Sequence, residues 1–478
     1  MNENRNKNGK KYVLIFIILG IFLRLLLCWY NPPENYFDDH FAPTLLFLAK
    51  GEIPHKDACL ECFHPPVFYY ASAVVYKIAL SMGINEKKVI FKLLQFVNCF
   101  YSILTLGLIF LILNKLRLSD LSRTMALGTI CFLPRHIYMS AIYSNDAMTY
   151  LFVSLCAYFL LISIEKKSSL FSLVALSISM TIAIFIKWNA LVVIPMAAVT
   201  FALAFIYRII VPRKKALISL IIVLIIPTVF FSIYMVKNIN MYGTPLPLAA
   251  HFNEYDSYRQ LRMNNGEIKF FNFTPWQYMK NPIISPGQVS SFWTLIYSGM
   301  WFDTEPAFLY FTDPNNEWWH SYFSALYMGQ DFPTGDPLSF YTHLLGAVLI
   351  VLGLIPLILL IVGFCKSILR NFIWHSNSDA TETIKIQIFT TLTLFSFIVV
   401  IVGAFICPVF SRMKATYVLN SISAFAVFIA LGITHFEKYA LISKIITVSF
   451  LLIFLFSMLH IIQIIHALSN LLMIIPYS

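Results

Sequence analysis

The chain has few charged residues for its length. Asp, Glu, Lys and Arg make up 12% of its 478 residues, about half the share of an ordinary globular protein. Apolar residue types make up 59%, against about 45–50% in globular proteins. A soluble protein could not keep so much apolar surface out of water. This composition excludes a soluble protein, and it also excludes the disordered, collagen-like and disulfide-scaffold classes.

The sequence also lacks a repeat of fixed period, an inverted repeat, and a small-residue cleavage site after its first apolar segment. Its net charge of +11 raises nucleic-acid binding as a function. No basic helix or basic–aromatic platform lies outside the apolar runs, which excludes that function. Excess Lys and Arg on cytoplasmic loops explain the charge. The remaining class is an all-α polytopic membrane protein.

Runs of about 17–25 apolar residues predict helices that span a membrane. The sequence contains eleven such runs, at 12–30, 89–113, 124–142, 147–164, 168–186, 189–207, 216–236, 341–364, 385–407, 415–433 and 440–466. The apolar segment 66–82 also carries three Tyr and one Lys. We predict an amphipathic helix at the membrane interface there, and an uncleaved anchor in the first span.

The basic residues predict the orientation of these spans. With a cytoplasmic N-terminus, the inner segments hold 18 Lys and Arg in about 65 residues, and the outer segments hold 13 in more than about 170. Acidic residues show the opposite distribution, with 17 of 23 outside. We expect three parts: a transmembrane module over 1–236 that includes the outer loop 31–88, a large extracytoplasmic loop over 237–340, and C-terminal transmembrane helices over 341–478.

The scarce charges near the membrane boundary gather on the outer side. The carboxylates are Asp38, Asp39 and Asp146, and the cations are Lys187, Arg135, Lys237, Arg412 and Lys414. Each has a simpler explanation as a helix cap, a solvated loop residue or a side chain that reaches the interface. Their common side favours one outer-face site, in which a carboxylate accepts a proton and cations hold a departing phosphate.

Cys59 and Cys62 form a C-x-x-C motif on the outer side, flanked by His55 and His64. A local disulfide is the simplest explanation in an oxidising compartment. A zinc site that includes the two histidines and a pair of free thiols are alternatives. Carboxylates in the large loop leave a divalent cation open, although no EF-hand spacing is present. The sequence therefore predicts no certain cofactor.

These motifs, taken in order, resemble the GT-C glycosyltransferases that use polyprenyl-phosphate sugars, in particular the protein O-mannosyltransferases and the lipid A aminoarabinose transferases. The similar elements occur in order over residues 36–417, a range that is most of the chain. They are the Asp38-Asp39 pair, the stretch from His64-Pro65-Pro66 through Tyr69-Tyr70, the Asp146 tip, Lys187, the segment 237–246 and the segment 412–417. The sequence departs from the pattern of these families at three places. It has an Asp-Asp pair in place of Asp-Glu, Lys237 in place of Arg, and Thr416 where Arg is frequent.

The resemblance implies the GT-C fold and an inverting glycosyltransferase with an extracytoplasmic active site. Asp38 or Asp39 would be the base, Asp146 would orient the base or the acceptor, and the cations would bind the donor phosphate. The side chains of His64, Pro65, Pro66 and Tyr69 would position the first outer loop.

The partners implied are a polyprenyl-phosphate-sugar donor, a protein, lipid or glycan acceptor, and the bilayer of a prokaryotic cytoplasmic membrane, or of the endoplasmic reticulum in a eukaryote. Two alternatives are a transporter or flippase of polyprenyl-linked glycans and a non-enzymatic assembly protein. A transporter should carry its charges near the midplane and show repeats, and an assembly protein needs no paired carboxylates.

Overall fold

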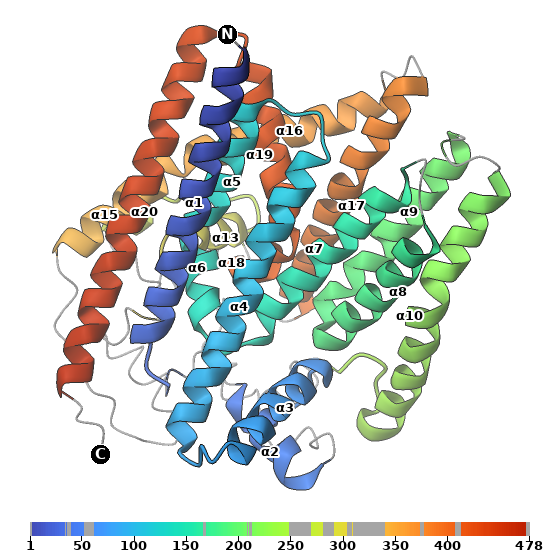
Figure 1. The fold of residues 1–478 in the computed structure, drawn as a ribbon, viewed down its shortest axis with the longest axis vertical. Coiled ribbons are helices and arrows are strands. Elements are labelled where there is room, and N and C mark those ends of the chain that lie inside the picture. The colour runs from blue at the N-terminus through green and yellow to red at the C-terminus, as the bar shows by residue number, and fades with distance from the viewer. Residues whose placement is uncertain are drawn as a thin grey trace.

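The protein is a bundle of helices (Figure 1). The computed structural model describes residues 2–33, 35, 40–51, 62–165, 169–207, 209, 213–247, 269–280, 291–303, 308, 340–372, 377–406 and 413–474. Its helices are α1 (Asn2–Tyr30), α2 (Phe41–Lys50), α3 (Val67–Ser81), α4 (Lys87–Asn114), α5 (Asp120–Cys131), α6 (Pro134–Ala141), α7 (Asn145–Ser163), α8 (Leu170–Ile186), η2 (Trp188–Val192), α9 (Val193–Ile206), α10 (Arg213–Tyr242), α12 (Gln277–Lys280), α13 (Phe292–Trp301), α15 (Phe340–Leu352), α16 (Leu354–Phe372), α17 (Asn377–Ile406), α18 (Ala415–Val418), η9 (Leu419–Ser421), α19 (Ile422–Phe436) and α20 (Ala440–Ile474). No strand occurs within these ranges.

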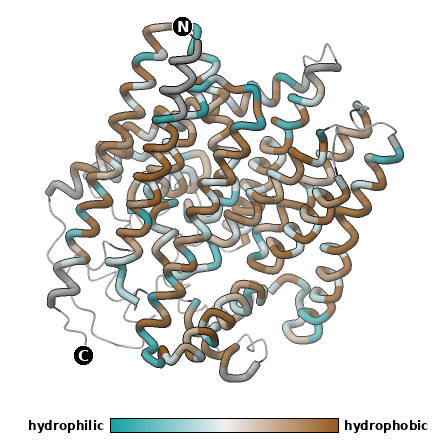
Figure 2. Tube along the Cα trace, viewed as in Figure 1, coloured by the Kyte–Doolittle hydropathy of each residue, from teal (hydrophilic) through white to brown (hydrophobic). Residues whose placement is uncertain are grey.

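Nine helical segments of the described chain are long and apolar enough to cross a membrane. They coincide with nine of the eleven predicted spans, and the chain is a multi-pass membrane protein. Figure 2 shows hydrophobic residues along the middle of the long helices and hydrophilic residues mostly toward their ends. The predicted span 168–186 corresponds to α8, a shorter apolar helix of 17 residues. The predicted count of eleven is therefore not confirmed.

The predicted span 124–142 is not one continuous helix. Helix α5 ends at Cys131 and α6 begins at Pro134. Proline has no N–H to donate and its ring clashes with the preceding turn, so it ends a helix on its N-terminal side. The break leaves backbone carbonyls at the end of α5 without helical partners, and such groups are costly inside a membrane.

Arg24 of α1 satisfies these carbonyls. Its Nη1 donates to Cys131 O at 2.8 Å, and its Nη2 donates to Ile130 O at 3.2 Å. The remaining guanidinium contacts are to Gly20 O, Ser102 Oγ and His136 Nδ1. Arg24 is fully buried, and all its N–H groups are used. It is therefore a structural cation that caps α5.

Helix α4 supports two other helix ends. Lys92 donates to the carbonyls of Cys28 and Asn31 after the last turn of α1. Asn98 donates to Met139 O at 3.1 Å and also to Ile142 O, at the end of α6. Through these contacts, α4 holds the C-terminal ends of α1 and α6.

Helices α16 and α19 cross at two glycines. A Cβ atom on Gly363 would collide with the backbone of Phe428, and one on Gly432 would collide with the backbone of Leu359. Small residues let the backbones of two membrane helices approach closely. The glycines therefore determine how closely α16 and α19 approach each other.

Helices α2 and α3 lie together at one end of the bundle, at the bottom of Figure 1, and the N-terminus lies at the opposite end. Helix α3 agrees with the helix predicted at 66–82. Its Tyr70, Val74 and Ile78, four residues apart, are about half exposed, whereas Phe68 and Tyr69 are buried. An exposed apolar face on a short helix is typical of the interfacial helix that the sequence predicts.

Candidate functional site

The candidate site is built around a buried ion pair between α7 and the end of α8. Lys187 Nζ lies 2.7 Å from Asp146 Oδ1, and their side chains are 9% and 1% exposed. The side chain of Ser144 caps α7 by accepting from the backbone N–H of Asp146. Asp146 therefore lies in the first turn, where the helix dipole favours a carboxylate. The capping role considered for Asp146 belongs to Ser144.

A third segment of the chain joins this pair. The ammonium of Lys187 lies 5.2 Å from the centre of the Tyr417 ring, within the range of a cation–π contact. Tyr150 of α7 donates to Thr416 O at 2.8 Å. Lys414, which precedes α18, is buried. The structure thus brings together three predicted elements that are far apart in the sequence, while Arg412 lies outside the described residues.

Several polar side chains on the elements around the ion pair have no partner in the described structure. The unpartnered atoms are themselves buried, and they are both amide atoms of Asn145, both amide atoms of Asn189, Thr416 Oγ1 and Asn420 Oδ1. Each unpartnered buried polar atom costs about 1–3 kcal/mol. Such a concentration of unsatisfied groups in one region indicates a site that contacts a polar ligand.

Asp38 and Asp39 lie outside the described residues, but the structure describes Asn35 before them and His40 after them. Asn35 and His40 are buried. Asn35 donates to Asn31 Oδ1 at 2.8 Å, and Asn31 donates to Ala141 O at 2.7 Å. The residues that precede the aspartates are therefore linked to the end of α6, close to the turn that leads to Asp146.

Helix α2, which follows the aspartates, is held to the same turn. Thr44 Oγ1 lies 2.8 Å from the hydroxyl of Tyr143, and the Phe41 ring stacks on Tyr143 at 4.3 Å. Tyr143 precedes Asp146 by three residues. Thr44 and Tyr143 could not be predicted from the sequence, because a lone Thr and a lone Tyr carry no local signal of a long-range contact.

The predicted loop-positioning residues lie beside α2. The hydroxyl of Tyr69 is 2.9 Å from His40 Nδ1, and the His64 and His40 rings are 5.7 Å apart. Pro65 and Pro66 are buried, and Pro66 immediately precedes α3 and accepts from the N–H of Tyr70. This geometry is compatible with a role in holding the loop, which stays a prediction.

Two of the predicted phosphate ligands, Arg135 and Lys237, lie on α6 and α10. Arg135 is buried on α6, where its Nε donates to Gly299 O at 2.7 Å and its guanidinium lies over the Tyr138 ring. Lys237 is exposed on α10. Within the described part of the chain, neither residue contacts Asp146 or Lys187. Nη1 of Arg135 is buried without a partner there, and the assignment of Arg135 and Lys237 as phosphate ligands stays a prediction.

Cys62 is disulfide-bonded, and its partner lies outside the described residues, as does Cys59. The pairing of Cys59 with Cys62 therefore stays a prediction. Within the described part of the chain, no group of three or more His, Cys, Asp or Glu side chains could hold a metal ion. A divalent cation is not assigned to the site.

An apolar groove of about 600 Å³ lies among α5, α13, α16, α17 and α19. Its walls combine aromatic rings, among them Trp293, Tyr297 and Phe425, with aliphatic side chains such as Leu360 and Leu394. Val418, the residue after Tyr417, also lines it, and α18 packs against α13. The groove therefore adjoins the segment that carries Tyr417, and it offers a place for a long apolar chain.

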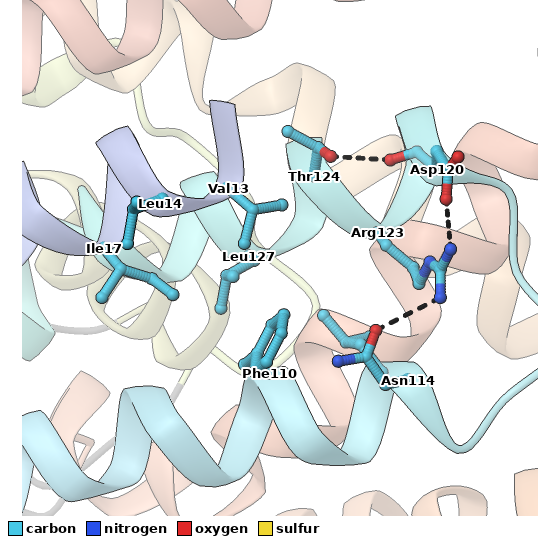
Figure 3. A pocket seen from close by; sticks show the side chains of 10 residues that line it. Val13, Leu14, Ile17, Phe110, Asn114, Asp120, Arg123, Thr124 and Leu127 are labelled. Atoms are coloured by element: carbon cyan, nitrogen blue, oxygen red, sulfur yellow. Dashed lines mark hydrogen bonds and ion pairs between the residues drawn. The ribbon is translucent and has the colours of Figure 1, made fainter. Parts of the chain in front are cut away.

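A second cavity, of about 550 Å³, lies among α1, α4 and α5. Figure 3 shows Arg123 between Asp120 and Asn114, facing apolar side chains of α1 such as Val13. Arg123 bonds to both polar neighbours, which leaves the pair electrically balanced. Because none of its lining residues has a buried unpartnered polar atom, we do not assign this cavity to the site.

No protein-family profile matches the chain, and no curated protein matches it. Solved structures do match. The Archaeoglobus fulgidus oligosaccharyltransferase in complex with Zn and sulfate has a TM-score of 0.50 and 10% identity, over 92% of this chain and 53% of that chain. The same enzyme tethered with an acceptor peptide containing the NVT sequon has a TM-score of 0.50 and 10% identity, over 96% of this chain and 55% of that chain. ArnT from Cupriavidus metallidurans bound to undecaprenyl phosphate has a TM-score of 0.35 and 14% identity, over 90% of this chain and 78% of that chain.

The likeness to the oligosaccharyltransferase extends along nearly all of this chain, which spans a little over half the length of that enzyme. At 10% identity such a likeness concerns the fold, because one fold hosts many functions. The chain therefore has the GT-C fold that the order of its sequence motifs predicts.

Proposed function

We propose that this protein is an inverting glycosyltransferase that moves a sugar from a polyprenyl phosphate to an acceptor hydroxyl or amine at the extracytoplasmic membrane face. The single observation that carries the proposal is the buried Asp146–Lys187 pair in contact with Tyr417, beside an apolar groove. A polar site next to a long apolar groove suits a donor with a charged head and a lipid tail.

The proposed reaction follows from the residue types. Asp38 or Asp39 accepts the proton of the acceptor hydroxyl. The acceptor oxygen then bonds to the anomeric carbon as the bond from that carbon to the phosphate oxygen breaks. The polyprenyl phosphate leaves with that electron pair, and the configuration at carbon inverts.

The cations differ in what they can contribute. The charge of Lys187 is compensated by Asp146 at 2.7 Å, so its main role is to hold that carboxylate in place. Lys414, buried just before α18, and Arg412 are the better candidates to stabilise the phosphate charge as it develops. Arg135 and Lys237 are weaker candidates, since Arg135 already donates to Gly299 O and Lys237 is exposed on α10.

The lipid tail is assigned to the groove lined by α13, α16 and α17. With the N-terminus in the cytoplasm, the end of the bundle that carries α2 and α3 faces the outside. In a prokaryote this would be the outer face of the cytoplasmic membrane, and in a eukaryote the lumen of the endoplasmic reticulum. A shared fold with an oligosaccharyltransferase solved with an acceptor peptide supports a transfer reaction of this kind.

The test is transfer from labelled polyprenyl-phosphate sugars by the purified full-length protein in liposomes. We expect Asp38→Asn or Asp39→Asn, whichever is the base, to lower transfer by about 10²- to 10⁴-fold. Asp120→Asn, at the opposite end of the bundle, is the matched control and should transfer as wild type does. Undiminished transfer by both the Asp38 and Asp39 variants would overturn the base assignment.

A further inference from the structure

Asn145 and Asn189 flank the two members of the buried ion pair in the sequence. Asn145 precedes Asp146 directly, and Asn189 follows Lys187 by two residues. The oxygen and the nitrogen of both amides are buried and have no hydrogen-bond partner in the described structure. Asn98 behaves differently, because its amide nitrogen donates to Met139 O and Ile142 O. The fold uses the nitrogen of the Asn98 amide, whose oxygen is unpartnered, and it uses neither end of the Asn145 and Asn189 amides.

The elements that carry these amides meet around the ion pair. Helix α7 begins at Asn145 and packs against η9, while η2, which contains Asn189, packs against α8 and α17. Helix α17 also contacts α7, α18 and η9. Two further unpartnered oxygens, Thr416 Oγ1 and Asn420 Oδ1, lie on α18 and η9. The unsatisfied groups thus come from four of the elements that meet around the pair, namely α7, η2, α18 and η9.

The chemistry of these groups selects one kind of ligand. An amide oxygen needs a donor and an amide nitrogen needs an acceptor. A phosphate diester only accepts, so it would leave the amide oxygens unsatisfied. A sugar hydroxyl both donates and accepts, and it satisfies both ends of an amide.

We propose that Asn145 and Asn189 bind the hydroxyl groups of the donor's glycosyl moiety and so form its specificity subsite, an inference that rests on the proposed function. The phosphate then lies toward Lys414, and the sugar lies against the amides and the Asp146–Lys187 pair. A site that hydrogen-bonds a substrate hydroxyl discriminates strongly against an analogue without it. The two asparagines would therefore decide which sugar is transferred.

The experiment compares the binding of undecaprenyl phosphate and of undecaprenyl phosphate linked to mannose, glucose or aminoarabinose by the purified full-length protein. The variants are Asn145→Leu and Asn189→Leu, which are close to the wild type in size and cannot hydrogen-bond. For the preferred glycosylated carrier we expect binding about tenfold weaker. Binding of the bare carrier should stay within about twofold of wild type.

Thermal unfolding separates this role from a structural one. Asn145→Leu and Asn189→Leu should unfold at or above the wild-type temperature, because they remove unpartnered polar groups. Asn98→Leu is the matched control, and it should unfold at a lower temperature because its amide holds the end of α6.

Three results would overturn the subsite. They are equal weakening of the bare and glycosylated carriers, no weakening of either, or a loss of thermal stability like that of Asn98→Leu. If wild-type protein binds neither form of the carrier, the proposed function is wrong and the subsite falls with it. If wild type binds the bare carrier and the leucine variants bind both forms normally, the subsite alone is wrong.

Discussion

Arg24 Nη2 lies 2.7 Å from Nδ1 of His136, although 112 residues separate them in the sequence. A guanidinium can only donate, so His136 accepts at Nδ1 and carries its proton on Nε2. This contact ties α1 to α6 directly after the break at Pro134. It also explains how a cation can occupy the middle of the first apolar span.

Substitution of Arg24 should destabilise the bundle. Arg24→Met removes the donors to Ile130 O and Cys131 O, and hydrogen bonds from charged groups are worth about 1.5–3 kcal/mol each. We expect a loss of at least about 3 kcal/mol and a smaller loss for Arg24→Lys, which keeps the charge with fewer donors. Thermal unfolding in detergent measures both. Arg123→Met, at a partly exposed pair, should cost less than about 1 kcal/mol, and equal effects at the two sites would contradict the capping role.

The Asp146–Lys187 pair should show strong coupling between its members. Lys187→Met leaves a buried carboxylate without its cation, and Asp146→Asn leaves a buried ammonium without its anion, each at a cost of about 3–5 kcal/mol. The double variant removes both charges and should recover most of the thermal stability while transfer stays low. A double-mutant cycle on unfolding and on transfer measures this coupling.

The matched control for that cycle is the pair of Lys115 and Glu165. Both side chains are about one-third exposed, and they lie 3.2 Å apart, so Lys115→Met should cost about 0–1 kcal/mol. Additive effects of the Asp146 and Lys187 substitutions would show that the two side chains are not coupled.

The crossing of α16 and α19 should not tolerate a methyl group. Gly432→Ala places its Cβ against the backbone of Leu359, which cannot move aside as a flexible side chain could. We expect a loss of about 1–3 kcal/mol, as for overpacked cores, measured by thermal unfolding. Gly403→Ala is the control, since nothing lies within 4 Å of its Cβ position, and it should be neutral or stabilise α17. Equal unfolding temperatures for the two variants would show that α16 and α19 do not cross at Gly432.

A bulky residue in the apolar groove should affect long donors more than short ones. Leu394→Trp narrows the groove, so we expect at least a tenfold higher KM, about 1.4 kcal/mol, for an undecaprenyl-phosphate donor. A donor with a prenyl chain of about ten carbons should be little affected. Ile398→Trp, one turn along α17 and half exposed, is the control that should leave both KM values unchanged. Equal KM changes for long and short donors would place the tail elsewhere.

The disulfide of Cys62 should be detected in the purified protein. Peptide mass spectrometry before and after reduction will identify its partner, which we expect to be Cys59. Cys59→Ser and Cys62→Ser should then lower the unfolding temperature equally, because either change removes the same cross-link. Different effects, or a peptide that links Cys62 to another cysteine, would show that the pairing is wrong.

Local patterns were enough to predict much of the fold. Nine predicted spans coincide with helices long enough to cross a membrane, and the segment 66–82 forms the separate helix α3. The apolar run 124–142 predicted one continuous span, although Pro134 within it favours the end of a helix. The hydrophobicity of a segment predicts whether it lies in lipid. It does not predict whether the helix is continuous, which here depends on the backbone N–H that Pro134 lacks. Arg24, on another helix, stabilises the break.

By itself, the sequence determined that the protein lies in a membrane and where most of its spans run, because lipid solvation acts on each segment separately. It also predicted a site among the scarce charges near the ends of the spans. Only the tertiary structure decided which of those charges meet. It pairs Asp146 with Lys187 beside Tyr417, directs Arg135 to Gly299 O, and leaves Lys237 exposed. Side-chain distance depends on how the helices cross, and crossing is settled by contacts such as those at Gly363 and Gly432 that no local pattern encodes.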